Sequence, residues 1–129
     1  MNILKAAAYK KPHINYCQGM NYVTAFIYQI TNDEEETFYF FYGILNSTEY
    51  GDIFLNELKK LKQFFYVFER LLFIYTPELS IYLKNNSIQV SYFVSPWFIT
   101  LFTSSYQYIN NTISPKILVR IWDEFMLVK

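Results

Sequence analysis

The residues whose types and spacing could do chemistry are concentrated in one short segment, Tyr16 to Asn21, which reads Tyr-Cys-Gln-Gly-Met-Asn. A thiol, a primary amide and a glycine follow one another there, shortly after a break in the chain at Pro12. An ionised thiol is a nucleophile, whereas an amide can orient a bound group through its two donors and its acceptor. The segment therefore allows three interpretations.

The first interpretation makes Cys17 the nucleophile of a hydrolase. Cys17-Gln18-Gly19 partly matches the caspase signature, in which the histidine base lies about 50 residues upstream. The single histidine of this chain, His13, lies only four residues before the cysteine. No neighbouring group predicts a lowered thiol pKa, so we do not expect a cysteine hydrolase.

The second interpretation is a structural turn between two helices. A small buried thiol at Cys17 and a glycine that permits close backbone approach at Gly19 both fit such a turn. We expect Tyr16 and Cys17 to pack, and Met20 and Asn21 to pack and to start the next helix. This interpretation leaves the polar amide of Gln18 unexplained.

The elements that must position this segment read as helices. Between Asp52 and Tyr75 the apolar residues recur at steps of three or four, which predicts one long amphipathic helix. Thr76-Pro77 and Ser114-Pro115 are typical helix starts, with a hydroxyl N-cap followed by proline at the first helical position. The fold class is therefore all-α, with at least five helices and no sheet. The stripe on the long helix consists of Leu55, Leu58, Leu61, Phe65, Phe68, Leu72 and Tyr75.

Shorter helices are expected around these. One covers Ile3 to Lys11, one begins at Pro77 and ends at the cluster 85–87, and a last one covers 116–129 with the apolar face Ile117, Ile121, Phe125 and Val128. Four consecutive carboxylates, Asp33 to Glu36, could form an acidic patch for a basic partner. We favour the alternative that they open a helix, where they complement its dipole.

Composition excludes several classes of function. A chain of 129 residues suffices for one domain. Because 11 basic residues balance 11 acidic residues, the chain lacks the net positive charge that would attract nucleic acid or an anionic membrane surface. One Cys and one His exclude a disulfide framework and a Cys/His zinc site, so no metal or cofactor is expected. The 13 Phe, 13 Tyr and 2 Trp could form a stacking surface, but we interpret them as core residues. With no leader and no stretch near the roughly 18 apolar residues of a membrane span, we expect a soluble, intracellular domain.

The third interpretation comes from a resemblance. Tyr16 to Asn21 is similar to the signature hexapeptide of the TBC domain, the Rab GTPase-activating family. The family's further motifs follow in order: an acidic turn and an aromatic helix, a Leu-x-x-x-x-Pro-Glu-Leu stretch, Trp-Phe-x-Thr-Leu-Phe, and Arg-Ile-Trp-Asp. They correspond here to 33–36 with 38–45, 72–79, 97–102 and 120–123.

The resemblance implies that the chain activates a GTP-bound Rab-type GTPase without being a hydrolase itself. Gln18 matches the family's glutamine finger, which replaces the GTPase's own glutamine while an arginine stabilises charge on the transferring phosphoryl group. Tyr16 is the first position of the Tyr-x-Gln element, and Gly19 would allow close approach to the backbone of the Rab switch. A cytoplasmic location, with peripheral association with endomembranes left open, is implied in the same way.

The chain departs from the family in its arginine. The family's catalytic arginine belongs to an Ile-x-x-Asp-x-x-Arg element upstream of the glutamine loop, and the nearest match, Ile30 to Glu36, ends in glutamate on the wrong side of Gln18. Arg70 and Arg120 fall in other motifs. We therefore expect residues 1–129 to be the central part of a TBC domain, without the upstream arginine segment and the C-terminal helices. Apolar faces such as Ile117, Ile121 and Phe125 should then be partly uncovered.

Two functions of different class remain. One is GTPase activation of a Rab-type GTPase with Gln18 as the glutamine finger. The other is a catalytically inactive TBC-derived scaffold or GTPase-binding module in membrane trafficking. For Trp97, Trp122 and Asp123 we expect structural roles, the indoles in the core and the carboxylate in a local pair.

Overall fold

The computed structural model describes residues 2–47, 49–104 and 113–127. Within these ranges the chain forms seven α-helices and two 3₁₀ turns and no strand, which confirms the all-α prediction. The helices are α1 (Asn2–Lys10), α2 (Met20–Thr31), α3 (Glu34–Ser47), α4 (Lys59–Tyr75), α5 (Pro77–Asn85), α6 (Ser91–Thr100) and α8 (Pro115–Leu127), with η1 (Gly51–Phe54) and η2 (Asn56–Leu58) between α3 and α4.

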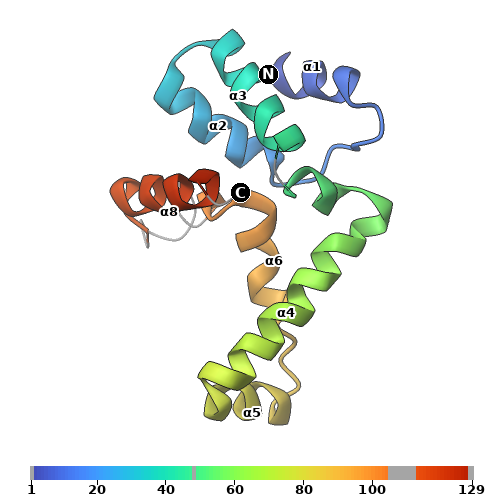
Figure 1. The fold of residues 1–129 in the computed structure, drawn as a ribbon, viewed down its shortest axis with the longest axis vertical. Helices are drawn as coiled ribbons and strands as arrows, with labels where there is room; N and C mark the ends of the chain where they lie inside the picture. The colour runs from blue at the N-terminus through green and yellow to red at the C-terminus, as the bar shows by residue number, and fades with distance from the viewer. Residues whose placement is uncertain (1, 48, 105–112, 128–129) are drawn as a thin grey trace.

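The helices form a bundle and an arm (Figure 1). α1, α2 and α3 lie together at one end of the molecule. α4 leads away from them, α5 folds back against α4 at the far end, and α6 returns along α4 toward the bundle. α8 lies beside the near end of α6, below α2. The C-terminal end of α6 is thereby the place where segments far apart in the sequence meet.

The core lies within the bundle and under α8. Val23, Phe26 and Ile27 of α2 pack there with residues of α3, and Trp122 of α8 meets Phe26 edge to face, with ring centroids 5.0 Å apart. Leu118 of α8 is fully buried. Burial of large side chains of this kind contributes about 1.5–3 kcal/mol each, so Leu118 and Trp122 attach α8 to the core.

Local signals set several helix ends as expected. Asp33 accepts the backbone N–H of Glu36 through Oδ1 at 2.8 Å, so it is the N-cap of α3, and the next three carboxylates occupy the first turn. α5 and α8 begin at Pro77 and Pro115. α5 ends at Asn85, within the predicted cluster. The interpretation of the acidic run as a helix start is therefore confirmed.

The predicted helix from Asp52 is wrong at its beginning. Residues 51–58 form two 3₁₀ turns, Glu57 and Leu58 have positive φ angles of 54° and 62°, and the α-helix starts only at Lys59. The stripe begins with two steps of three residues, a spacing that a 3₁₀ turn satisfies as well as an α-helix. The chain bends here because Ile53 and Phe54 turn into the core of the bundle.

Thr76 is the N-cap residue of α5, as predicted, but it makes no capping hydrogen bond through its side chain. Its hydroxyl donates to the carbonyl of Leu72, and its backbone N–H bonds to the same oxygen, so Thr76 ends α4 and does not cap α5 through its side chain. Of the last helix, α8 ends at Leu127, and Val128 of the predicted face lies outside the described residues.

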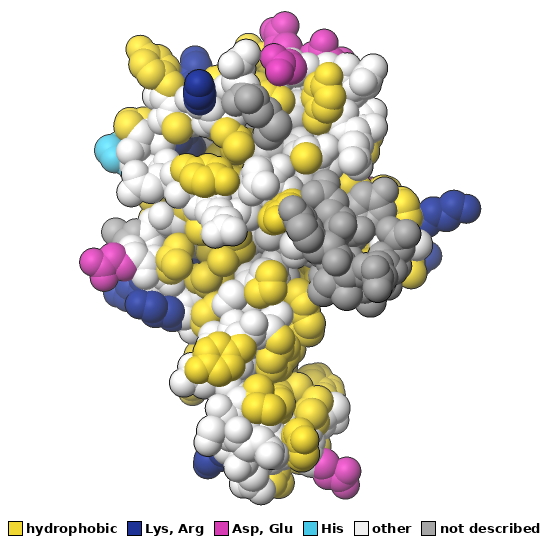
Figure 2. All heavy atoms as spheres, turned by 180° about the vertical axis from the view of Figure 1, so that it is seen from behind, with side chains coloured by type: hydrophobic (Ala, Val, Ile, Leu, Met, Phe, Trp, Pro, Cys, Tyr) yellow, Lys and Arg dark blue, Asp and Glu magenta, His cyan; other side chains and the backbone are white. Residues whose placement is uncertain are grey.

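Much apolar surface remains uncovered, as expected for Ile117, which is 55% exposed. The stripe of α4 is buried at Leu61 but ends at Tyr75, which is 78% exposed. Figure 2 shows hydrophobic side chains along the arm. Ile121 and Phe125 line an apolar groove of about 930 Å³ between α4, α6 and α8. Within the described ranges no helix combines the length and the apolar character that a membrane crossing requires.

Candidate functional site

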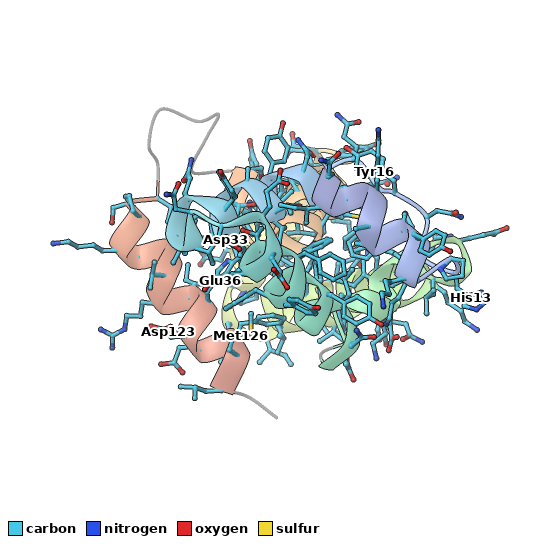
Figure 3. All side chains as sticks on the ribbon, turned by 90° about the horizontal axis from the view of Figure 1, so that it is seen from above. His13, Tyr16, Asp33, Glu36, Asp123 and Met126 are labelled. Carbon is cyan, nitrogen blue, oxygen red and sulfur yellow. The ribbon has the colours of Figure 1, made fainter. Side chains whose placement is uncertain are left out.

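The segment with Gln18 lies in the connection between α1 and α2. After α1, the Lys11 ammonium donates to the carbonyl of Leu45 at 3.0 Å, and Ile14 is buried in the core. The connection is therefore anchored at its beginning to the end of α3. Figure 3 shows Tyr16 on this connection, apart from the acidic turn at Asp33 and Glu36.

The turn itself depends on Gly19. Its φ of 118° lies in a region that side-chain-bearing residues rarely adopt, and a Cβ placed on it would lie 2.6 Å from Cγ2 of Ile99. Gly19 is buried against the C-terminal end of α6. The close approach that the structure shows at Gly19 is to Ile99 of the same chain, which gives this glycine an intramolecular role, and the close approach to a Rab backbone stays a prediction.

The end of α6 forms a platform for this turn. The last carbonyls of a helix lack intrahelical partners, and here three are satisfied by side chains. Tyr50 donates its hydroxyl to Ile99 at 2.6 Å, Thr103 donates to Thr100 at 2.6 Å, and the Trp122 indole N–H donates to Leu101 at 2.9 Å. The platform is consequently tied to η1 and α8, and the turn rests on a rigid support.

Gln18 is exposed at the outside of this turn. Its side-chain amide forms no hydrogen bond with any residue that the structure describes, although its backbone carbonyl accepts a weak bond from the Cys17 thiol at 3.6 Å. The two donors and the acceptor of the amide are therefore available to a bound partner. An amide does not titrate, so Gln18 can orient or stabilise a reacting group but cannot move a proton as a general base does.

Tyr16 differs from the prediction that it packs. It is 59% exposed, and its hydroxyl donates to Oδ1 of Asn21 at 3.4 Å. The same oxygen accepts the backbone N–H of Gly19 at 3.1 Å. Asn21 was expected only to pack and to start α2; it also connects both sides of the turn.

Cys17 is half-buried against the core, and burial raises the pKa of its thiol above the ordinary value. A raised pKa disfavours the thiolate that a nucleophile needs. Cys17 donates only to the neighbouring carbonyl of Gln18, and His13 is exposed (Figure 3). The geometry therefore agrees with the structural interpretation of Cys17.

The remaining residues singled out from the sequence, two tryptophans, one aspartate and two arginines, lie outside the turn, on α4, α6 and α8. Trp122 is buried, as expected, and Trp97 stacks on Phe102 at 5.8 Å. Asp123 is exposed on α8 and forms no ion pair with any described residue, so the expectation of local pairing stays a prediction. Arg70 on α4 and Arg120 on α8 are both exposed. In the part of the chain that is described, no three His, Cys, Asp or Glu residues cluster as metal ligands would.

The sequence indicated the turn that bears Gln18, but it did not indicate the residues of α6 and η1 that support this turn. Tyr50 and Ile99 carried no signal, because neither lies in a polar motif and their contact joins residues 49 positions apart. Asn21 did carry one, since an amide two residues after a glycine can accept the exposed N–H at a helix start.

Comparison with known proteins gives one consistent result. The family model of the Rab-GTPase-TBC domain matches residues 1–129. The chain is similar to TBC1 domain family member 2A of Homo sapiens, with 29% identity over 96% of this chain and 13% of that protein. It is similar to the human Ecotropic viral integration site 5 protein homolog, with 26% identity over 97% of this chain and 14% of that protein. Small G protein signaling modulator 3, also human, is 30% identical over 95% of this chain and 15% of that protein. The chain thus spans less than a sixth of the length of these relatives.

Proposed function

Because the chain belongs to the Rab-GTPase-TBC domain family, we propose that it is the part of a GTPase-activating protein that presents Gln18 to the active site of a GTP-bound Rab-type GTPase. The single observation that supports this proposal is the state of Gln18. It is exposed and its amide is unbonded to described residues, on a turn that Gly19 anchors to α6. An exposed polar side chain on a rigid support is suited to entering another protein's site.

The proposed mechanism uses the amide for positioning. In GTP hydrolysis the transition state places charge on the phosphoryl oxygens, and the attacking water must be held in line with the leaving group. Gln18 would orient that water or the groups around it in place of the GTPase's own glutamine. A preorganised amide is most valuable in the transition state, so its loss should lower the rate of hydrolysis more than the affinity for the GTPase.

An arginine completes the proposal. Arginine fingers contribute about 10³–10⁵ in rate to GTPase activation. Arg70 and Arg120 lie on α4 and α8 and not on the connection that bears Gln18. We therefore assign the arginine to sequence outside residues 1–129, in an Ile-x-x-Asp-x-x-Arg element. Residues 1–129 alone should be a poor activator.

The test is hydrolysis by a panel of GTP-loaded Rab proteins, with the chain extended upstream to include the arginine element. Gln18→Ala should lower stimulated hydrolysis by about 10-fold or more, which is about 1.4 kcal/mol of barrier. The helical spectrum and the melting temperature should stay nearly unchanged. Gln29→Ala is the matched control, because Gln29 is an exposed glutamine on α2 away from the turn.

Two results would contradict the proposal. If the extended wild-type chain binds a GTP-loaded Rab without changing its hydrolysis rate, the scaffold or GTPase-binding function is correct instead. If Gln18→Ala unfolds the protein, Gln18 is a structural residue and its assignment to the site is wrong.

A further inference from the structure

One side-chain oxygen joins a residue before Gln18 to the residue directly after it on the turn. Oδ1 of Asn21, the second residue of α2, accepts the Gly19 backbone N–H at 3.1 Å and the Tyr16 hydroxyl at 3.4 Å. Asn21 is half-buried, so the Gly19 bond is partly shielded from water. Together with the backbone bond from the N–H of Met20 to the carbonyl of Cys17, this arrangement encloses Gln18 in a hydrogen-bonded ring and ties Tyr16 to the start of α2.

The direction in which the turn presents Gln18 depends on the backbone conformation of the turn. Because the Gln18 side chain has no hydrogen bond to a described residue, its placement comes from the backbone of the turn. The other backbone bonds of the turn run from Met20 to the Cys17 carbonyl at 3.1 Å and from Tyr22 to the Gly19 carbonyl at 3.0 Å. The first of these bonds spans Gln18 and the second lies on its helix side, whereas the bond from the Tyr16 hydroxyl adds a restraint on the residues that precede the turn.

We propose that Asn21 is a positioning residue for Gln18. This inference rests on the proposed function, and it names the group that keeps the glutamine turn in the conformation that acts. A backbone turn held in one conformation before binding loses less conformational freedom when the complex reaches the transition state. Asn21 therefore acts through the turn, without touching the GTPase.

The expected effect is a loss of rate at nearly constant affinity. A net hydrogen bond of ordinary strength corresponds to about 3–10-fold in an equilibrium or a rate. Asn21→Ala should lower kcat of stimulated hydrolysis by about this factor, with less than about a 2-fold change in Kd for the GTP-loaded Rab. Exchange of the Gly19 amide hydrogen should become faster by a similar factor, because its acceptor is gone.

The experiment compares variants of the extended chain by kinetics, binding and hydrogen exchange. Asn21→Asp keeps an oxygen acceptor at the same place and a carboxylate is favourable in a first helical turn, so it should restore slow exchange of the Gly19 amide and most of kcat. Asn46→Ala is the matched control, since this exposed asparagine bonds to Tyr42 within α3. Tyr16→Phe removes only an exposed hydroxyl and should lower kcat by about 2-fold with the fold intact.

The outcomes separate this inference from the proposed function. If Gln18→Ala impairs hydrolysis while Asn21→Ala is fully active, the inference is wrong and the proposed function stands. If Asn21→Asp exchanges the Gly19 amide as fast as Asn21→Ala does, the acceptor role is wrong. A wild-type chain that stimulates no Rab overturns both. Should Asn21→Ala fail to fold, an unchanged kcat in Tyr16→Phe would overturn the ring, and a lowered kcat would support it.

Discussion

Replacement of Gly19 by alanine tests whether the turn is held by contact with α6. The added Cβ would lie 2.6 Å from Cγ2 of Ile99 and 3.1 Å from Cγ2 of Thr100. Both of these methyl groups belong to β-branched side chains, which have little rotamer freedom in a helix. The neighbours cannot move aside easily, so the turn or the end of α6 must shift.

Two effects add in this variant. A residue other than glycine at a φ of 118° is strained by about 1–3 kcal/mol. Forcing a methyl group into a packed site costs about 1–3 kcal/mol more. Allowing for partial relaxation, we expect Gly19→Ala to lower the free energy of unfolding by about 3 kcal/mol. That is a large share of the roughly 5–15 kcal/mol by which most domains are stable.

The assay is urea denaturation followed by circular dichroism, with matched glycine controls. Gly43 lies within α3 and has no atom within 4 Å of its would-be Cβ, so Gly43→Ala should stabilise by up to about 1 kcal/mol. A double-mutant cycle with Ile99→Ala isolates the steric part, because that change removes the closest atom. We expect a favourable coupling of about 1–2 kcal/mol between the two substitutions.

The reasoning is refuted if Gly19→Ala unfolds within about 0.5 kcal/mol of the wild type. It is refuted in part if the coupling with Ile99→Ala is zero, since the destabilisation would then come from backbone strain alone. Either result would show that the turn does not depend on its contact with α6.

Two further substitutions address the platform and the start of α3. Tyr50→Phe should lower stability by about 1–2 kcal/mol at neutral pH, measured by urea denaturation, because the carbonyl of Ile99 loses its donor. Burial raises the pKa of the Tyr50 hydroxyl above its ordinary value near 10, and the negative charge of a nearby Cys17 thiolate adds a smaller increase. Just above pH 10, therefore, the hydroxyl loses its proton in the unfolded chain but keeps it in the folded chain. Wild-type stability should therefore be unaffected by Tyr50 below about pH 10 and fall above it, by up to about 1.4 kcal/mol per pH unit, and Tyr50→Phe should lack this component. Asp33→Ala should lower the melting temperature through a loss of about 1 kcal/mol, because the N–H of Glu36 loses its cap, whereas Glu34→Ala should change it much less.

The helices were predictable from sequence because their signals are local. Asp33 caps α3 through a residue three positions on, and the prolines at 77 and 115 start α5 and α8 through their own restricted φ. Each signal acts within about one helical turn, so no knowledge of the rest of the fold is needed. The one long-helix prediction that was wrong, at 52–58, concerned a segment whose three-residue spacing suits two helix types.

The candidate site was also predictable in part from local sequence. Sequence pattern alone singled out Gln18 as a polar residue without a structural purpose beside a glycine, and the structure places it on the surface with its amide unbonded to described residues. Its role in hydrolysis stays a prediction. The exposure of Tyr16 could not be read from its type, because a tyrosine serves equally in a core and at a surface.

Sequence by itself determined the helical class, most helix boundaries and the position of the polar turn, because periodicity and caps are properties of neighbouring residues. Only the tertiary structure decided why the turn is rigid. Gly19 meets Ile99, Tyr50 bonds to the Ile99 carbonyl, and Trp122 bonds to the carbonyl of Leu101. These partners lie 21 to 80 residues apart in the chain (99 − 19 = 80 for Gly19 and Ile99). No local pattern encodes such pairs, since they form only when packing of the bundle brings the end of α6 beneath the turn.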